Sequence, residues 1–436
     1  MEIIALLQPV NHLLDKTTMR QLVLIVNAMI AMTGRVTMLG ISRWTEKGGS
    51  YRTIQRFFQT TIEWSKLNWH LFLEHRYTQG EYVAMAGDHT VVTKSGKQTH
   101  GLGYFFSSIQ NKPVKGLEFF SLSMINISRR ESTPILMEQT IRVKSNVSEN
   151  EEVSTAPAEK RKRGRPKGSK NKNHRDIKLP AHLEVIQKHI ASTLAMIGQK
   201  VHVRYMLLDG AFGNNNAVQM SRRCSLHLIS KLRFDAALYY PYKGPQKRRK
   251  YGEKVNPHQI SEHYLVSQIH EDEFETRIYG FQARSKKFPD LLNIAVIQRI
   301  NHKTNKICHV ILFSSDLDLD TKELVDFYAL RFQIEFNFRD AKQFWGLEDF
   351  MNTKETHVNN AANLAMFMVN ASHALSDQMS ASESSMSILD LKSYFRGRKY
   401  VKEVLKYLPN KPDVFLIETL FAKVGLLGSI NCLNSP

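Results

Sequence analysis

The chain has 436 residues, 42% of them hydrophobic and 10% aromatic, which describes a globular protein of two or three folded units rather than a disordered one. Its formal net charge of +19 indicates a polyanionic partner, and no apolar run reaches the ~18 residues that span a bilayer, so we expect nucleic acid rather than a membrane. Three distant cysteines without a CxxC pair indicate neither a zinc site nor a disulfide framework, as expected for a reduced, cytoplasmic chain.

Residues 1–78 are expected to be helical. Apolar residues recur at helical spacing between Leu22 and Met29, and a second helix is expected from Tyr51 to beyond Phe58. Ser50 follows a Gly-Gly turn and is a good N-cap for that helix. Its exposed face would carry Arg52, Gln55, Arg56 and Gln59. This pattern resembles a helix-turn-helix that contacts DNA, and the alternative is a plain helical bundle with a basic surface.

Short strands are expected from Tyr82 onward, in three successive apolar runs separated by turn residues. The first run carries Asp88 at its centre. An acid in the middle of an apolar strand is costly to bury without a partner, so Asp88 is a candidate functional residue, the alternative being an ordinary strand aspartate. His89 is set aside because neighbouring side chains on a strand face opposite ways.

Residues 145–178 form the least globular stretch, acidic at first and then abruptly basic, and we expect a flexible insert there. Its basic half contains an AT-hook core, made of Arg163, Gly164, Arg165 and Pro166. Arginines on an extended backbone suit the negative potential of a narrow A·T-rich minor groove. A solvated linker or a localisation signal is the alternative.

Two further segments suggest chemistry. After a helix at about 181–197, an apolar strand ends in Asp209, which is where open α/β sheets place functional groups. Residues 232–306 then read as a β-rich insertion. It begins with a basic-aromatic loop that includes Tyr239, Tyr242, Lys247, Arg248, Arg249 and Tyr251. Interleaved aromatic and cationic residues suit stacking on unpaired bases, and an exposed basic loop is the equally weighted alternative.

The run from Phe327 to Gly346 is expected to form one helix. Tyr328, Arg331, Glu335 and Lys342 would then project within about 60° of one another from an otherwise apolar, buried helix. A carboxylate between two cations suits a metal-bound phosphate, although Arg and Glu four residues apart are also common on ordinary helix surfaces.

The spacing Tyr-x2-Arg-x3-Glu-x6-Lys resembles the signature of DDE transposases of bacterial insertion sequences, specifically the insertion sequence four family. The resemblance covers roughly residues 82–375. It implies an α/β, RNase H-like catalytic core in which Asp88 and Asp209 are the other two catalytic acids. It also implies that a β-rich insertion precedes the helix of Glu335.

By the same resemblance, Asp88, Asp209 and Glu335 hold two Mg²⁺ ions, which Mn²⁺ can replace. Arg331 and Lys342 would hold a DNA phosphate, to which Tyr328 donates a hydrogen bond. Water would attack at an end of the element, and the freed 3′-hydroxyl would attack target DNA. The implied partners are double-stranded DNA, as terminal inverted repeats and target, and a second copy in a DNA-assembled homodimer at the bacterial nucleoid.

The expected domains follow from these segments. They are a helical DNA-binding domain at 1–78, a catalytic core at 79–231 and 307–376 with the AT-hook insert inside it, the β-rich insertion at 232–306, and a C-terminal helical region at 377–436. Two other functions stay open, a nuclease of the same fold that does not join DNA and a non-enzymatic architectural protein that uses the AT-hook. A hairpin step is unsupported, because the insertion contains no tryptophan to stack on a flipped base.

Overall fold

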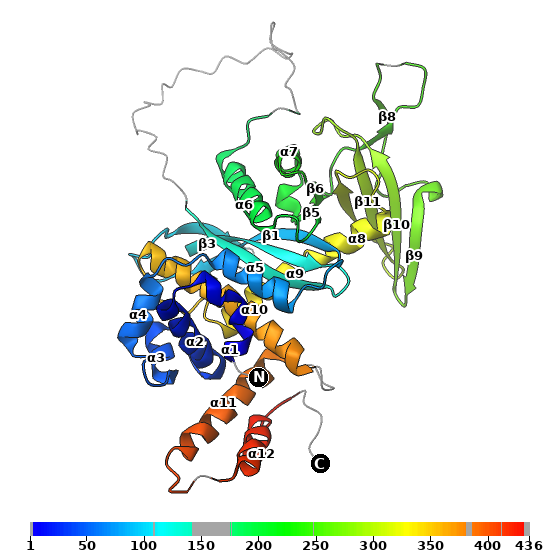
Figure 1. Cartoon of the computed structure of the whole chain (residues 1–436). Coiled ribbons are helices and arrows are strands. Elements are labelled where there is room, and N and C mark those ends of the chain that lie inside the picture. Colours follow the sequence, from blue (N-terminus) through cyan, green and yellow to red (C-terminus); the bar gives the residue numbers. More distant parts are fainter. Residues whose placement is uncertain are drawn as a thin grey trace, which may run out of the picture.

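The computed structural model describes residues 3–107, 110–141, 175, 177–246, 248–380, 386–410 and 412–430 (Figure 1). The predicted insert at 145–178 lies almost wholly outside these residues, and with it the AT-hook from Arg163 to Pro166. Lys247 of the basic-aromatic loop is also outside them. Within the described residues, no helix is both long enough and apolar enough to cross a membrane.

The N-terminal segment is helical, as predicted. Its elements are α1 (Ile3–Leu6), η1 (Gln8–Leu13), α2 (Lys16–Ala31), α3 (Met38–Trp44), α4 (Tyr51–Gln59) and α5 (Trp64–His75). Ser50 caps α4 by accepting a hydrogen bond from the backbone N–H of Thr53. Arg52 and Arg56 are exposed on α4, while Phe57 faces the core. The sequence did not predict α3, whose seven residues are too few for a helical period to stand out.

A large mixed sheet forms the centre of the molecule. Its first strands are β1 (Val83–Thr93), β2 (Gly103–Ser107), β3 (Lys112–Asn126), β4 (Glu131–Thr140), β5 (Val203–Leu208) and β6 (His227–Leu232). β3 pairs antiparallel with β1, β2 and β4, whereas β1, β5 and β6 are parallel neighbours. This arrangement is consistent with an RNase H-like core. β4 was not predicted, because Pro134 is unusual inside a paired strand; the register with β3 shifts beside it.

Among its described residues, the predicted insertion contains five strands, of which the last three prolong the same sheet. The five are β7 (Tyr239–Pro241), β8 (Tyr251–Lys254), β9 (Leu265–Glu271), β10 (Phe274–Ala283) and β11 (Leu292–Asn301), with η3 (Glu262–Tyr264) before β9 and β12 (Ile307–Ser314) after β11. β12 pairs antiparallel with β6, and β11, β10 and β9 follow outward in that order. The short strands β7 and β8 form a separate two-stranded sheet, and Tyr239 of β7 also forms an isolated bridge with Arg284.

Helices cover both faces of the sheet, and β1 contributes to a core on each face. α6 (Ala181–Ile197) and α7 (Asn215–Arg223) lie on one face, while the N-terminal helices and α10 (Glu355–Ser380) lie on the other (Figure 1). Ala84 and Ala86 belong to the core with α2 and α10. Val83 and Met85 belong to the core with α6 and α7. Successive side chains of β1 therefore point into opposite cores, and the strand is buried between two helical layers.

The prediction of one helix from Phe327 to Gly346 is wrong. The run forms α8 (Thr321–Leu330) and α9 (Gln333–Phe344), separated by Arg331 and Phe332. Both separating residues keep right-handed helical angles, but the backbone tightens. The N–H groups of Arg331, Phe332, Ile334 and Glu335 each bond to the carbonyl three residues back. The expectation that the apolar residues here are buried also fails for Phe332, which is 48% exposed. Arg331 therefore stands at a junction between two helices.

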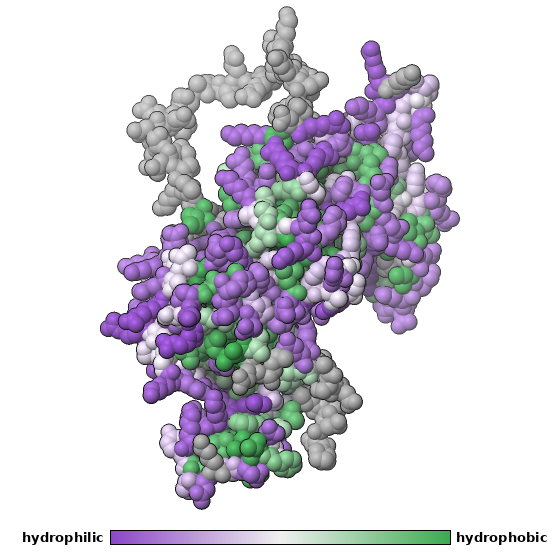
Figure 2. All heavy atoms as spheres, in the orientation of Figure 1, coloured by the Kyte–Doolittle hydropathy of each residue, from purple (hydrophilic) through white to green (hydrophobic). Residues whose placement is uncertain are grey.

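The C-terminal region continues with α11 (Ile388–Leu405) and α12 (Val414–Gly425), of which α12 was not predicted. Two basic residues of α11 cap other helices: Arg396 donates to the carbonyl of Ala31, and Lys399 to that of Trp44. Figure 2 shows a mostly hydrophilic surface with hydrophobic residues gathered near α12, where Phe415 is 81% exposed.

Candidate active site

Three acids from separate segments line one cavity of about 660 Å³. Asp88 comes from β1, Asp209 from the end of β5, and Glu335 from the first turn of α9. The remaining lining residues are His89, Thr90, Arg331, Phe338, Arg339, Lys342, Gln343 and Glu348. The cavity thus joins the two candidate aspartates to the cationic face of α9.

The parallel pairing of β1 and β5 explains why the two aspartates meet. Gly87 lies opposite Leu208 in the register, so the next residue on each strand is an aspartate. Gly87 is also needed for close packing, since a Cβ atom there would lie 2.8 Å from Met206 and 2.9 Å from Phe120. Asp209 leaves the strand at this point and caps a short 3-10 turn by accepting from the N–H of Ala211 at 3.1 Å.

The orientation of Glu335 is fixed by polar contacts on the opposite side of α9. The side-chain amide of Asn337, only 1% exposed, donates to the hydroxyl of Ser132 on β4 at 2.7 Å and to that of Ser123 on β3 at 3.3 Å. Rotation of α9 would break these bonds and leave a buried amide without a partner. The sheet therefore sets the face of α9 that reaches the cavity.

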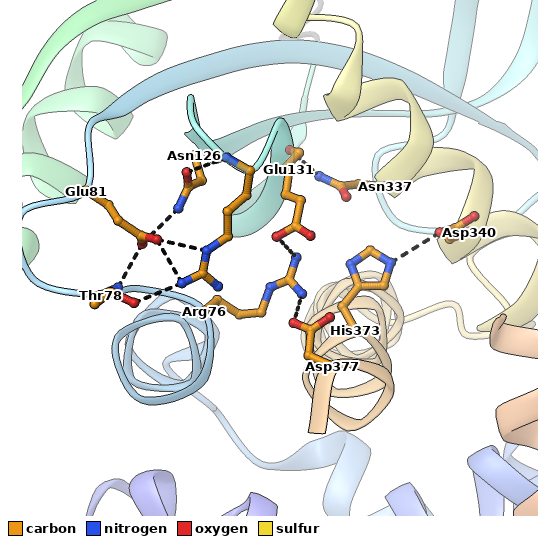
Figure 3. Close-up of polar contacts among 11 residues, drawn as sticks. Arg76, Thr78, Glu81, Asn126, Glu131, Asn337, Asp340, His373 and Asp377 are labelled. Atoms are coloured by element: carbon orange, nitrogen blue, oxygen red, sulfur yellow. Dashed lines mark hydrogen bonds and ion pairs between the residues drawn. The ribbon is translucent and has the colours of Figure 1, made fainter. Parts of the chain in front are cut away.

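Further contacts tie α9 to α10 and α10 to the sheet (Figure 3). The imidazole Nε2 of His373 on α10 lies 3.4 Å from the buried carboxylate of Asp340 on α9. Arg76, 5% exposed, pairs with Glu131 at the start of β4 at 2.9 Å and with Asp377 of α10. The first contact holds α9 against α10, and the second links α10 to β4 through Arg76.

Arg331 bridges two of the three acids. Its Nη1 donates to Oδ2 of Asp88 at 3.0 Å, and its Nη2 donates to Oε1 of Glu335 at 3.0 Å. The side chain is only 13% exposed, and its buried Nε finds no hydrogen-bond partner among the described residues. A planar guanidinium suits this double contact, which a lysine could not reproduce.

Burial dominates the electrostatics of Asp88. Desolvation raises its pKa from the ordinary 3.8 to about 6, Arg331 and the backbone N–H of His89 oppose this rise, and the charges of Asp209 and Glu335 add to it. A carboxyl whose ionised form is disfavoured in a cavity with two other acids is typical of a functional site.

Lys342 and Tyr328, the other two residues of the predicted signature, differ from Arg331 and Glu335 in their contacts. Lys342 lines the cavity, where its Nζ donates to the carbonyl of Val91 at 2.9 Å and lies 3.6 Å from Glu348. Tyr328 is not among the lining residues; its ring lies 5.9 Å from the guanidinium of Arg331. Burial raises the pKa of the Tyr328 phenol, which therefore stays a hydrogen-bond donor at neutral pH.

Sequence reasoning missed several lining residues. Phe338, Arg339 and Gln343 follow Glu335 at offsets of three, four and eight, so they share its helical face, and that spacing was a usable signal. His89, set aside from the sequence, also reaches the cavity. Its ring is parallel to that of Phe212 with centroids 6.2 Å apart, and burial lowers its pKa to about 4, so the imidazole is neutral.

The basic-aromatic loop does not belong to this cavity. The rings of Tyr239 and Tyr251 meet edge to face with centroids 5.5 Å apart, and the guanidinium of Arg249 lies 4.6 Å from the ring of Tyr242. Arg248 is exposed. The aromatic residues of this loop therefore contact one another and its cations in the free chain.

The donor set of the cavity fits a hard divalent cation. Carboxylate oxygens are the ligands that Mg²⁺ prefers, usually with several waters retained. Two ions ~3.5–4 Å apart can be spanned by such a set.

A comparison with known protein families identifies the superfamily of the chain. The sequence model of a family described as DDE superfamily endonuclease matches residues 9–278, more than half of the chain. The match includes Asp88 and Asp209 and ends before Glu335. No curated protein matches the chain.

Proposed function

The chain belongs to the DDE superfamily of endonucleases, and from this premise we propose that it is a transposase of the insertion sequence four type. The family implies nuclease or phosphoryl-transfer activity on DNA, generally with divalent metal ions. The observation that carries the finer proposal is the single cavity lined by Asp88, Asp209 and Glu335 together with Arg331 and Lys342. Cleavage at the element's ends and strand transfer into target DNA would both use this site.

Asp88, Asp209 and Glu335 would hold two Mg²⁺ ions, with Mn²⁺ as a substitute. Bound there, the ions supply an activated water or hydroxyl nucleophile and stabilise charge on the attacking and leaving oxygens. Asp88 must lose its proton to act as a ligand, and its raised pKa makes this step sensitive to pH. Of the two carboxylates that pair with Arg331, that of Glu335 is more exposed than that of Asp88, with a side chain 41% exposed.

Arg331 and Lys342 would bind the phosphates of the DNA. Arg331 uses two of its five N–H donors on the two carboxylates, and bidentate contact with a phosphate would exchange one or both of these bonds. Lys342 can likewise exchange the carbonyl of Val91 for a phosphate oxygen. Tyr328, adjacent to Arg331, would donate a hydrogen bond to the phosphate or hold the guanidinium in its new position.

The helix α4, the basic-aromatic loop and the AT-hook would bind DNA outside the carboxylate cavity. The net charge of +19 supports broad phosphate contacts. The exposed Arg52 and Arg56 support a role for α4 in groove binding, and the basic-aromatic loop suits unpaired bases. On its sequence alone, the AT-hook from Arg163 to Pro166 would take an A·T-rich minor groove. Joining two ends makes a homodimer assembled on DNA the natural working form.

A nuclease that cuts without joining would need the same three acids. The test is therefore a reaction between a supercoiled donor plasmid, carrying the DNA that flanks this coding sequence, and a separate target plasmid, with Mg²⁺. A transposase releases the segment and joins its 3′ ends to the target. Cutting without joined products would support the nuclease, and binding without cutting, in Mg²⁺ and in Mn²⁺, would support an architectural protein.

A further inference from the structure

A second cluster of ligand-type side chains lies on the outer strands of the sheet, away from the carboxylate cavity. It consists of His270 on β9, Glu275 on β10 and His302 just beyond β11. Each offers one potential ligand atom, and these atoms all lie within 4.8 Å of one another. Among the described residues, no other group of three or more His, Cys, Asp or Glu side chains meets this condition.

Strand pairing brings the three residues together. His270 lies directly opposite Glu275 in the antiparallel pairing of β9 with β10. Asn301, the last residue of β11, lies opposite Phe274, so His302 follows at the same end of the sheet. The backbone N–H of His302 donates to the carbonyl of Glu273 at 2.9 Å, which holds the turn after β11 against the β9–β10 hairpin.

The carboxylate of Glu275 is already oriented, with one oxygen committed and one turned toward an imidazole. Glu275 is 4% exposed. Its Oε1 accepts from the side chains of Gln268, at 2.6 Å, and Arg277. Its Oε2 lies 3.7 Å from Nε2 of His302. Outer partners that fix a carboxylate in this way are typical of metal sites, where they orient the ligand.

His270 and His302 can turn to complete a tetrahedral metal-binding geometry with Glu275. Both are exposed at the surface, so their rings can turn. Gln268 contacts His270 as well as Glu275, because its amide nitrogen also lies 3.2 Å from Nε2 of His270. A tetrahedral ion with bonds of about 2.0–2.1 Å needs ligand atoms roughly 3.3 Å apart, which small side-chain rotations reach from here.

We propose that His270, Glu275 and His302 form a binding site for Zn²⁺ or a similar late first-row divalent cation. Two imidazoles and one carboxylate select such ions over Mg²⁺, which prefers oxygen ligands. The ion would link β9, β10 and the turn after β11, and thereby stabilise the outer end of the sheet. The fourth position would be open to water, as in sites with three protein ligands.

The test uses the full chain, stripped with a chelator and titrated with Zn²⁺ by calorimetry. Excess Mg²⁺ is present throughout to occupy the oxygen ligands of the carboxylate cavity. The variants are His270→Ala and His302→Ala, with His263→Ala as the matched control because it is another exposed histidine of the same region. These exposed positions are chosen over Glu275, whose replacement would disturb buried contacts.

We expect one Zn²⁺ per chain with a Kd below about 10 μM, near −7 kcal/mol in binding free energy. Each ligand variant should weaken binding by more than about 100-fold, since loss of even an outer partner costs 10–100-fold. His263→Ala should bind normally. Zn²⁺ should also raise the Tm of the wild type and the control, but not of the ligand variants.

Two results would overturn the proposal. One is Zn²⁺ binding that His270→Ala and His302→Ala leave unchanged, which would place the ion elsewhere. The other is binding to the wild type weaker than about 10 μM, which would leave only an ion-paired surface cluster. Neither result bears on the carboxylate cavity, because the readout involves no DNA and the double variant Asp88→Asn/Glu335→Gln should bind Zn²⁺ like the wild type.

Discussion

Arg331 donates a 3.0 Å hydrogen bond to Asp88, and this contact joins the junction of α8 and α9 to the centre of β1. The same guanidinium holds Glu335 at 3.0 Å, so one cation bridges two acids that the sequence places far apart. Without a bound ion, this bridge neutralises part of the negative charge that the cavity would otherwise concentrate. Arg331 is therefore expected to compete with divalent cations for the same carboxylates.

Replacing Arg331 with alanine should affect metal binding and DNA cleavage in opposite directions. At pH 8, where Asp88 is ionised, Mn²⁺ should bind more tightly, by about tenfold or ~1.4 kcal/mol, because a competing positive charge is gone. DNA cleavage should fall because a phosphate ligand is lost. Paramagnetic resonance of free Mn²⁺ measures the first effect and plasmid nicking the second. Unchanged or weaker Mn²⁺ binding would refute the competition.

Replacing Asp88 with asparagine should stabilise the metal-free chain at neutral pH. Burial raises the Asp88 pKa from 3.8 to about 6, so the folded chain holds this proton more tightly than the unfolded chain. The stability this group contributes is full below about pH 4 and is lost as the pH rises through about 6. Asp88→Asn should therefore raise the free energy of unfolding by about 1–3 kcal/mol at pH 7.5 and change it little at pH 4.

Urea unfolding in the presence of a chelator, at both pH values, measures this effect. Asp235→Asn is an informative control, because a hydrogen bond from Arg233 lowers the pKa of Asp235 and the expected change at pH 7.5 has the opposite sign. A loss of stability for Asp88→Asn at pH 7.5 would mean that its pairing with Arg331 outweighs its burial.

Much of the fold was predictable from sequence, because strong periodicity coincided with recognisable caps and turns. α6 was expected near its observed position, and the β-rich character of residues 232–306 agrees with strands β7 to β11. The parts that were missed depend on tertiary contacts. β4 contains Pro134 and is held by pairing with β3, and α3 has only seven residues. The broken helix at Arg331 could not be predicted, since both separating residues favour helical angles locally.

The candidate site was predictable in its acids but not in its contacts. The strand carrying Asp88, the strand end at Asp209 and the spacing around Glu335 were all visible in the sequence. The bridge from Arg331 to Asp88 depends on how α9 packs on the sheet, which no local pattern encodes. The same holds for Asn337, a buried amide on a helix whose partners lie on β3 and β4.

Asn337 should matter for stability and for activity. Asn337→Ala leaves the hydroxyl of Ser132 without its partner and removes an anchor of α9, so the free energy of unfolding should fall by about 1–3 kcal/mol. Cleavage should fall as well, because the face that carries Glu335 is no longer fixed. The exposed Asn27 on α2 is a suitable control, with a change within about 0.5 kcal/mol. Full activity in folded Asn337→Ala would show that this anchor does not position the site.

The exposed arginines of α4 should contribute to DNA affinity rather than to catalysis. Replacing Arg52 and Arg56 with glutamine removes two charges, so the slope of log K against log salt should become shallower by about 2. Fluorescence anisotropy with duplex DNA at several salt concentrations measures the slope. An unchanged slope would favour the plain helical bundle over a DNA-contacting helix-turn-helix.

Asp88, Asp209 and Glu335 are proposed to form one metal-dependent site for DNA cleavage. The most direct measurement is Mg²⁺-dependent nicking of a plasmid carrying the flanking DNA, with Asp88→Asn, Asp209→Asn and Glu335→Gln compared with the wild type. Glu323→Gln, an exposed acid on α8, is the matched control. We predict that the wild type and the control cut, and that each site variant loses at least about 100-fold in rate. Cutting by Glu335→Gln at the wild-type rate would show that Glu335 is not part of the cleavage site.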